Sequence, residues 1–201
     1  MTWIKTIACD KASGKLKKLY DRIKGPDDNI DNIMLAHSLR PHTMEGHMAV
    51  YKYVLHHSAN TLSRSYLETI GVYVSLLNSC EYCVEHHFAG LVRLLQDGKR
   101  ANDVRRALED NQPARVFEGK ELAGLKYAAR LTSNPSAVDS QDLDKLRQSG
   151  FNDGEILEIN QVSAYFAYAN RTVLGLGIDI DGDVLGLSPG DASDMTNWSH
   201  R

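Results

Sequence analysis

The sequence predicts an all-α fold, and three observations support this. Apolar residues recur at intervals of three and four, the period of an amphipathic helix, along most of the chain. Glycine, proline and capping residues separate these apolar segments. The alternating pattern of a half-buried strand is convincing nowhere, and residues 177–187 are the one stretch where a strand could form. We therefore expect a bundle of helices.

Nine helices are expected, and several have recognisable ends. Gly25 and Pro26 stop the first helix. Pro41 ends the second, because the residue before proline avoids the helical region. A capping box, Asn152-Asp-Gly-Glu155, opens the last helix. The expected helices cover residues 13–24, 31–39, 43–57, 66–77, 80–97 (closed by Gly98), 102–109, 118–131, 140–149 and 152–174.

The domain organisation follows from the length and from a change in pattern near the end. Residues 1–187 are enough for one all-α domain with a substantial core. Residues 188–201 are polar, contain Pro189-Gly190 and lack periodicity, so we expect a flexible tail or an arm that clasps another copy.

A weak internal repeat also occurs in the sequence. Leu67-Glu68 matches Leu157-Glu158, and twelve residues further on residues 80–84 align with residues 170–174. A duplicated helical unit and a chance match between helical sequences both explain this. If the repeat is real, the second copy has lost the cysteines.

Composition excludes several classes of function. The formal net charge of −3 leaves no basic surplus for nucleic acid or an anionic membrane. No apolar run approaches the ~20 residues of a membrane span, and residues 1–10 lack the layout of a signal peptide. Three cysteines, one of them the isolated Cys9, do not make a disulfide scaffold. We therefore expect a cytoplasmic protein that binds neither nucleic acid nor membrane.

The residues with the clearest chemistry lie between Glu68 and His87. Cys80 and Cys83 form a C-x-x-C pair, with His87 four residues after the second cysteine and Glu68 twelve before the first. With Asn78 as N-cap and Glu81 completing a capping box, a helix is expected to begin just before Cys80. Cys80, Cys83 and His87 then share roughly a 60° arc of one helix face, and His86 points elsewhere.

Both thiols are expected to be reactive. Helix N-terminal amides and a nearby imidazole lower the pKa of a thiol, and the thiolate is the nucleophile. Glu68 lies in a segment, residues 66–77, that is apolar nearly all round and therefore reads as a buried helix. A buried carboxylate is costly unless it is paired, and His87 is the candidate partner, although Arg64 offers an ordinary ion pair four residues away.

Metal binding is the main alternative interpretation of the Cys80 and Cys83 pair. Zinc commonly takes four ligands, and only a histidine and Glu68 could add to the two cysteines. Asp179, Asp181 and Asp183 faintly resemble a calcium loop, but glycine is at the fourth position and glutamate is missing at the twelfth. We expect no metal and no bound cofactor. The histidines at positions 37, 42, 47, 56 and 57 share no metal-binding spacing and are assigned to packing and surface roles.

The spacing Glu-x11-Cys-x-x-Cys-x3-His on paired helices resembles the alkylhydroperoxidase D-like superfamily, which also contains carboxymuconolactone decarboxylase. The chain length and the ending Asn170-Arg-Thr-Val-Leu-Gly-Leu-Gly resemble its "peroxidase-related" branch. The resemblance implies an alkylhydroperoxidase D-like helical bundle, homo-oligomers and a thiol-dependent peroxidase cycle. It implies that Cys83 is the peroxidatic thiol, that Cys80 is the resolving, reductant-facing thiol, and that Glu68 and His87 relay protons.

One residue departs from the family pattern. Tyr82 stands where characterised hydroperoxidases of this superfamily often have histidine, and a phenol cannot relay protons near neutrality, although it can donate a hydrogen bond. The expected function is reduction of hydroperoxides at the expense of an external dithiol, either a reductant protein or a small thiol. A redox-sensing dithiol module and non-redox lyase chemistry of the decarboxylase type are the alternatives.

Overall fold

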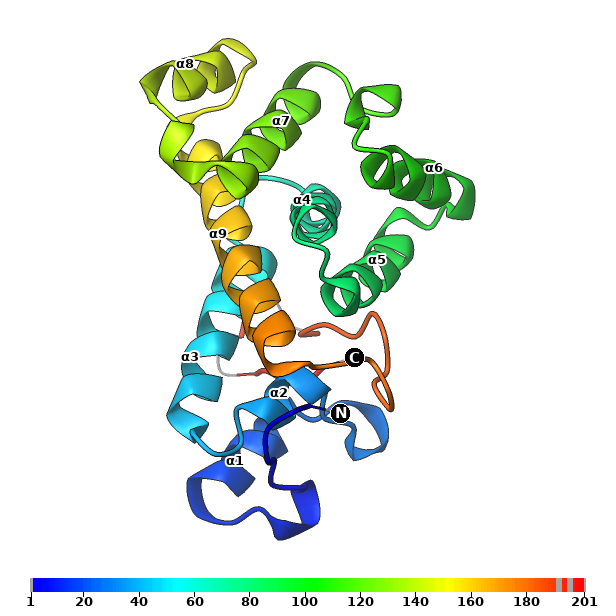
Figure 1. Ribbon diagram of the computed structural model, residues 1–201, viewed down its shortest axis with the longest axis vertical. Helices are drawn as coiled ribbons and strands as arrows, with labels where there is room; N and C mark the ends of the chain where they lie inside the picture. Colours follow the sequence, from blue (N-terminus) through cyan, green and yellow to red (C-terminus); the bar gives the residue numbers. More distant parts are fainter. Residues whose placement is uncertain (1, 191–192, 195–196, 201) are drawn as a thin grey trace.

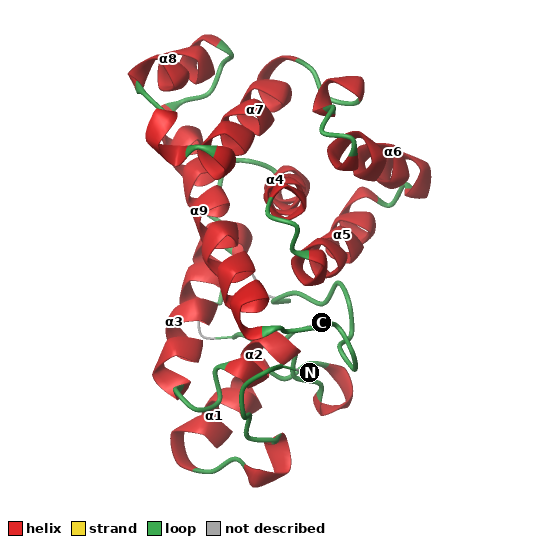
Figure 2. Ribbon diagram, viewed as in Figure 1, coloured by secondary structure: helices red, strands yellow, loops and turns green. Residues whose placement is uncertain are grey.

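The computed structural model describes residues 2–190, 193–194 and 197–200. Its helices, drawn in Figures 1 and 2, confirm the all-α prediction, and no strand forms among the described residues. Residues 177–187, the one candidate strand, form turns and loop. The α-helices are α1 (Gly14–Ile23), α2 (Asn32–Ala36), α3 (Pro41–Tyr51), α4 (Arg64–Leu77), α5 (Glu81–Leu95), α6 (Gly98–Glu109), α7 (Gly119–Ser133), α8 (Ser140–Gln148) and α9 (Asp153–Leu176).

Helix α4 is the centre of the molecule. Ser63 caps it, because its side chain accepts a hydrogen bond from the amide of Tyr66 at 3.2 Å. The run from Tyr66 to Ser75 is buried throughout, as the sequence predicts. Helices α5, α7 and α9 pack against it, and Figure 1 shows α4 nearly end-on between them. Residues on α4 therefore lie inside the core, and a charged one there needs a partner.

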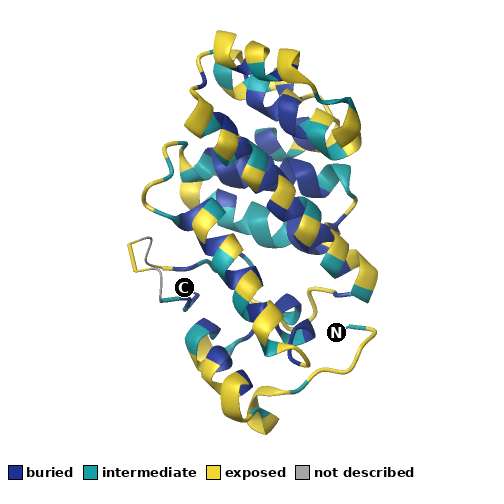
Figure 3. Ribbon diagram, turned by 90° about the vertical axis from the view of Figure 1, so that its left-hand side faces the viewer, coloured by how far each residue is buried: buried dark blue, intermediate teal, exposed yellow. Residues whose placement is uncertain are grey.

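Helices α4 and α9 approach closely at Gly71. A Cβ atom at this position would lie 2.2 Å from two carbons of the Phe166 ring, which is fully buried. Glycine is therefore required at this contact. Away from it, the helices bury one face and expose the other, as Figure 3 shows, which is the arrangement that their 3.6-residue period predicts.

Two predicted helix ends differ in the structure. Helix α5 ends at Leu95, with Gln96 in the left-handed conformation (φ 52°), and Gly98 is the first residue of α6 rather than a stop signal. The reason is that Asp97 caps α6 by accepting a hydrogen bond from the amide of Arg100 at 2.9 Å. The capping box of Asn152 and Glu155 at the start of α9 is confirmed. That helix continues past residue 174 and ends at Gly177, whose φ is 59°.

The C-terminal segment after α9, described for residues 177–190, 193–194 and 197–200, packs back onto the domain. Trp198 and His200 are buried, the guanidinium of Arg22 lies 3.7 Å from the centre of the Trp198 ring, and Nδ1 of His200 is 3.1 Å from the carbonyl of Ile23. The buried ammonium of Lys52 donates to the carbonyls of Asp194 and Asn197. The described part of the tail thus differs from the flexible, polar segment that the sequence predicts; residues 191–192, 195–196 and 201 lie outside the described residues.

Figure 1 shows this C-terminal segment beside α2 and below α5, near the N-terminus. Its two buried aromatic side chains explain why it docks, because they supply apolar surface that the polar composition conceals. No helix in the part of the chain that the structure describes is long and apolar enough to cross a membrane.

Candidate active site

The turn between α4 and α5 positions the two cysteines. Asn78 is the C-cap of α4 and not the N-cap of α5: its amide donates to the carbonyl of Val74, and its side chain donates to Asn170 Oδ1 at 2.9 Å. Ser79 then takes the left-handed conformation (φ 56°), and Cys80 becomes the N-cap of α5. The predicted capping box of Asn78 and Glu81 is therefore wrong, because Asn78 and Ser79 form the turn that reverses the chain between α4 and α5.

The two thiols lie together under the surface. Their Sγ atoms are 3.0 Å apart, Cys80 is 0% exposed and Cys83 is 3% exposed. The hydrogen bond between them lowers the pKa of Cys80, and the same bond together with burial raises the pKa of Cys83 well above its ordinary value. The Cys83 thiol thus stabilises a thiolate on Cys80, and Cys83 itself needs a base to remove its proton. Cys80 has no exposed surface, which differs from the reductant-facing position that the resemblance implies.

Glu68 and His87 form the predicted pair. Nδ1 of His87 is 2.8 Å from Oε2 of Glu68, and the carboxylate is buried. The other carboxylate oxygen, Oε1, is 4.0 Å from Nε2 of His56, which is also buried. Arg64, the alternative partner, donates to the side chain of Ser188 instead. Since Glu68 occupies Nδ1 of His87, the imidazole retains Nε2 for a substrate or a water molecule.

A small cavity of about 50 Å³ joins these groups to a second set of side chains. Cys83, Glu68 and His87 line it, and so do several residues that sequence reasoning did not select. Those residues come from α2, α3, α5, α9 and the C-terminal segment, and among them are Asp31, His47, Tyr51, His86, Tyr165, Ser188 and His200. The cavity has room for a molecule of a few heavy atoms.

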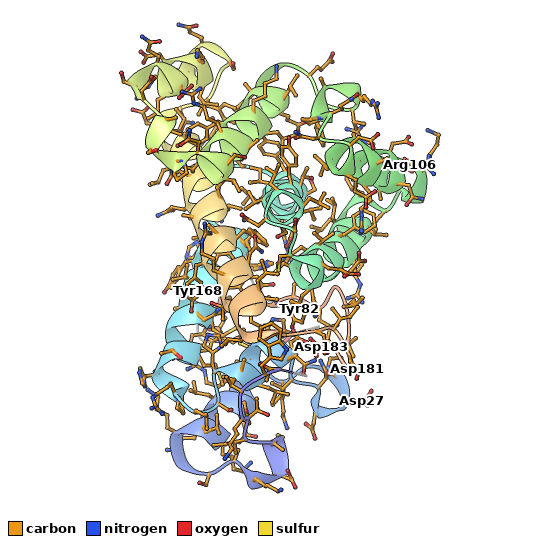
Figure 4. All side chains as sticks on the ribbon, in the orientation of Figure 1. Asp27, Tyr82, Arg106, Tyr168, Asp181 and Asp183 are labelled. Carbon is orange, nitrogen blue, oxygen red and sulfur yellow. The ribbon has the colours of Figure 1, made fainter. Side chains whose placement is uncertain are left out.

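Tyr82 and His86 meet at Asp183, which lies in the loop after α9. The phenol of Tyr82 donates to Asp183 Oδ2 at 2.7 Å, and Nε2 of His86 is 3.1 Å from the same oxygen. Figure 4 shows Tyr82 and Asp183 side by side, with Asp181 further out. Burial and the nearby Asp183 raise the pKa of Tyr82 well above its ordinary value. The prediction that His86 points away from the site is wrong, since it lines the same cavity as His87.

The acidic run 179–183 has a structural explanation. Asp183 accepts the amide of Asn32 at 3.0 Å, while the side chain of Asn32 donates to the carbonyls of Asp179 and Asp181, both at 2.9 Å. This run therefore fastens the C-terminal loop to the start of α2. Among the residues that the structure describes, no three His, Cys, Asp or Glu side chains are grouped so that they could hold a metal ion.

Asn170 on α9 is a further residue that the sequence did not single out for the site. It is fully buried, donates to Ser75 Oγ at 3.1 Å and accepts from Asn78. Its side-chain amide also lies close enough to the thiols to lower the pKa of Cys80, after the larger effect of Cys83. Asn170 could not be selected from local spacing, because it lies about ninety positions from the cysteines in the chain.

Comparison with known families places this site within a recognised segment. The sequence model of the carboxymuconolactone decarboxylase family matches residues 41–130, which run from the start of α3 into α7 and contain Glu68, both cysteines of the pair and His87. This segment is similar to the carboxymuconolactone decarboxylase family, and a solved alkylhydroperoxidase AhpD core shares the fold of the chain. Comparison with curated proteins gives no match.

Several solved structures share the fold of this chain. An uncharacterised peroxidase-related protein from Ralstonia eutropha JMP134, described as an alkylhydroperoxidase AhpD core, is 20% identical over 90% of this chain and 93% of its own, with a TM-score of 0.75. A peroxidase-related protein from Silicibacter sp. TM1040 is 24% identical over 75% and 76%, with a TM-score of 0.67. The debrominase Bmp8, solved with 2,3,4-tribromopyrrole, is 17% identical over 84% of both chains, with a TM-score of 0.62.

Proposed function

We propose that the protein is a thiol-dependent peroxidase that reduces small hydroperoxides through a dithiol–disulfide cycle of Cys83 and Cys80. The observation that supports this most directly is the cavity, in which Cys83 lies together with the His87–Glu68 pair. A nucleophile beside a histidine that a carboxylate orients is the arrangement that nucleophilic catalysis requires. The cycle starts from the dithiol form, in which both thiols are free.

The first step oxidises Cys83. His87, oriented by Glu68, takes the thiol proton through a bridging water or through Cys80, whose sulfur is 3.0 Å away. The Cys83 thiolate attacks the terminal oxygen of ROOH, so that an S–O bond forms while the O–O bond breaks. The sulfur becomes a sulfenic acid, and the alkoxide takes up a proton to leave as the alcohol.

The second step closes the disulfide. Cys80 attacks the sulfenic sulfur, water leaves, and the two sulfur atoms need to move only about 1 Å closer to reach bonding distance. An external dithiol then donates two electrons and two protons to restore both thiols. Because Cys80 is fully buried and Cys83 lines only a small cavity, the reductant needs the N-terminal end of α5 or the C-terminal segment to move aside.

The size of the cavity favours hydrogen peroxide and short-chain hydroperoxides. Its volume of about 50 Å³ accommodates the peroxide group and few additional atoms. Tyr51, Tyr165 and Met34 supply apolar surface for a short alkyl group. Bulkier hydroperoxides require the C-terminal segment, which contributes Ser188 and His200 to the wall, to move.

The test is peroxide consumption with dithiothreitol as reductant. Cys83→Ser should abolish turnover, and undiminished turnover would refute the assignment of Cys83. Cys80→Ser should leave a sulfenic acid on Cys83 that dimedone traps after peroxide treatment, and Cys9→Ser, which changes an exposed thiol, is the matched control with unchanged activity. Mass spectrometry should find the 80–83 disulfide in the oxidised wild-type protein.

The same assay separates the alternative functions. A reversible 80–83 disulfide with negligible peroxide turnover would identify a redox-sensing module. Turnover of a lactone or β-keto acid that survives loss of both cysteines would identify non-redox lyase chemistry by His87 and Glu68. The homo-oligomeric state and the cytoplasmic location inferred from the sequence remain predictions, and light scattering of the purified protein measures the first.

A further inference from the structure

A second imidazole–carboxylate pair borders the cavity through its imidazole. His86 lies on α5, three residues after Cys83, and its partner Asp183 comes from the loop after α9. Asp183 lies outside residues 41–130, which match the family model, so the pair joins a helix of the matched segment to the C-terminal region. His86 and His87 both line the cavity with Cys83.

Asp183 is held rigidly as an acceptor. Its side chain is 2% exposed, and its two oxygens accept hydrogen bonds from the amide of Asn32 at 3.0 and 3.1 Å. Oδ2 also accepts the phenol of Tyr82 at 2.7 Å and faces Nε2 of His86 at 3.1 Å. A carboxylate with this many donors stays in place, and it therefore fixes the ring of His86.

The orientation of His86 leaves one ring nitrogen available to exchange a proton with a bound ligand. Because Nε2 faces Asp183, the proton that the ring can exchange with a ligand is on Nδ1. The negative charge of Asp183 balances the positive charge of a protonated His86. The ring of Tyr82 packs on that of His86, with centroids 4.4 Å apart, and restricts its movement further.

We propose that His86 is the general acid of peroxide reduction, with Asp183 and Tyr82 as positioning residues. This inference rests on the proposed peroxidase function. When the Cys83 thiolate attacks the terminal oxygen of ROOH, the electron pair of the O–O bond leaves on RO, and His86 gives its Nδ1 proton to that oxygen to release ROH. The sulfur is oxidised and the peroxide is reduced; the proton that His87 took from Cys83 and the one that His86 gave are exchanged with solvent.

Separate groups for the base and the acid also give Tyr82 a role. Peroxide cleavage requires one group that accepts the thiol proton and one that protonates the leaving alkoxide. The His87–Glu68 pair does the first and the His86–Asp183 pair does the second. Tyr82 keeps the Asp183 carboxylate in position, so a phenol at this place is compatible with peroxidase chemistry without carrying protons itself.

The experiment compares leaving groups of different basicity. The rate of Cys83 oxidation is measured by quenched-flow mass spectrometry for ethyl hydroperoxide, whose alkoxide is a poor leaving group, and for peracetic acid, which is similar in size and whose carboxylate needs no proton. His86→Gln should slow the first reaction by about a hundredfold and the second by less than about threefold. Asp183→Asn should show the same selectivity, and Tyr82→Phe should show it to a smaller extent.

Controls distinguish failure of this inference from failure of the proposed function. His42→Gln changes an exposed histidine and should leave both rates unchanged. Equal losses on both substrates in His86→Gln, or no loss on either, would overturn the role of His86. If wild-type Cys83 reacts with neither substrate, the proposed peroxidase function fails instead. Tyr82→Phe removes only a hydroxyl and serves if Asp183→Asn does not fold.

Discussion

At the scale of single residues, Glu68 is a buried carboxylate that is stable only because it is paired. It lies on a helix whose residues from Tyr66 to Ser75 are all buried, where an unpaired charge would cost several kcal/mol. His87 on the next helix meets that need at 2.8 Å. Its counterpart in the possible repeat, Glu158, instead accepts hydrogen bonds from the backbone of Thr61 and Leu62 in a loop. The same residue type thus pairs with a histidine at one position and with loop amides at the other.

The role of Glu68 can be tested with an isosteric change. Glu68→Gln keeps the shape but removes the charge that orients and balances His87, so peroxide turnover should fall by about a hundredfold, the range of a lost acid–base contribution. The matched control is Glu45→Gln, which changes a surface glutamate paired with Lys15 and should keep wild-type turnover. Wild-type activity in Glu68→Gln would show that His87 needs no carboxylate.

His47 gives a prediction about stability and pH. Burial lowers its pKa to about 3, whereas an unfolded histidine titrates near 6.5. Between these values the unfolded chain binds one more proton than the folded chain. The stability contributed by neutral His47 is therefore fully present above about pH 6.5 and is lost as the pH falls toward 3, by up to about 1.4 kcal/mol per pH unit.

Urea unfolding at several pH values checks this prediction. His47→Phe should reduce the slope of unfolding free energy against pH between about 6 and 4.5 by roughly one proton. Part of the pH dependence of the unfolding free energy should remain in His47→Phe, because burial also lowers the pKa values of His37, His56 and His200. His42→Phe, at an exposed position, should leave the slope unchanged. Identical slopes in wild type and His47→Phe would contradict the assignment.

At the scale of helices, the contact of α4 with α9 connects stability to the candidate site. Phe166 on α9 contacts Gly71 on one side, and its ring lies 4.5 Å from that of His87 in an edge-to-face arrangement. A shift of α9 away from α4 would therefore move the wall behind His87. The helix pair thus fixes the position of the aromatic wall behind His87.

Gly71→Ala should destabilise the protein by about 1–3 kcal/mol, because the new methyl group overlaps the Phe166 ring. The measurement is the midpoint and slope of urea unfolding. Gly175→Ala is the matched control on α9: nothing lies within 4 Å of its Cβ, and removal of a helical glycine should stabilise by up to about 1 kcal/mol. Equal effects of the two changes would show that the helices can separate without cost.

At the scale of the whole molecule, the C-terminal segment closes the cavity. Ser188 and His200 line it, and Trp198 anchors the segment against Arg22. His200 also stacks on Tyr51, with the rings 6° from parallel, and so joins the end of the chain to α3. Access to Cys83 is therefore controlled by residues more than one hundred positions away.

Trp198→Ala should release this segment and expose Cys83. Losing even about 1.4 kcal/mol of local stability raises the open population tenfold, so iodoacetamide should alkylate Cys83 at least about ten times faster. The other tryptophan, Trp3, is 79% exposed, and Trp3→Ala should leave the alkylation rate unchanged. An unaltered rate in Trp198→Ala would mean that reagents reach Cys83 by another route.

Much of the fold could be predicted from the sequence, because local patterns carry it. Helical periodicity predicted each of the nine α-helices found among the described residues, and the capping box at Asn152 predicted the start of α9. The ends of α4 and α5 could not be predicted in the same way. Asn78, Gln96 and Gly98 are all acceptable capping residues, and only the path of the chain decides which of them is used.

In the candidate site, too, local contacts could be predicted from the sequence and long-range contacts could not. The sequence by itself determined the pairing of Cys80 with Cys83, which one helix turn places together, and offered Glu68 two partners, His87 and Arg64, between which the structure decides. Only the tertiary structure decided that Asp183 meets His86 and that Asn170 and His200 approach the thiol cavity. Those contacts join segments that are far apart in the chain, and their energy comes from packing of the folded molecule, which leaves no local pattern in the sequence.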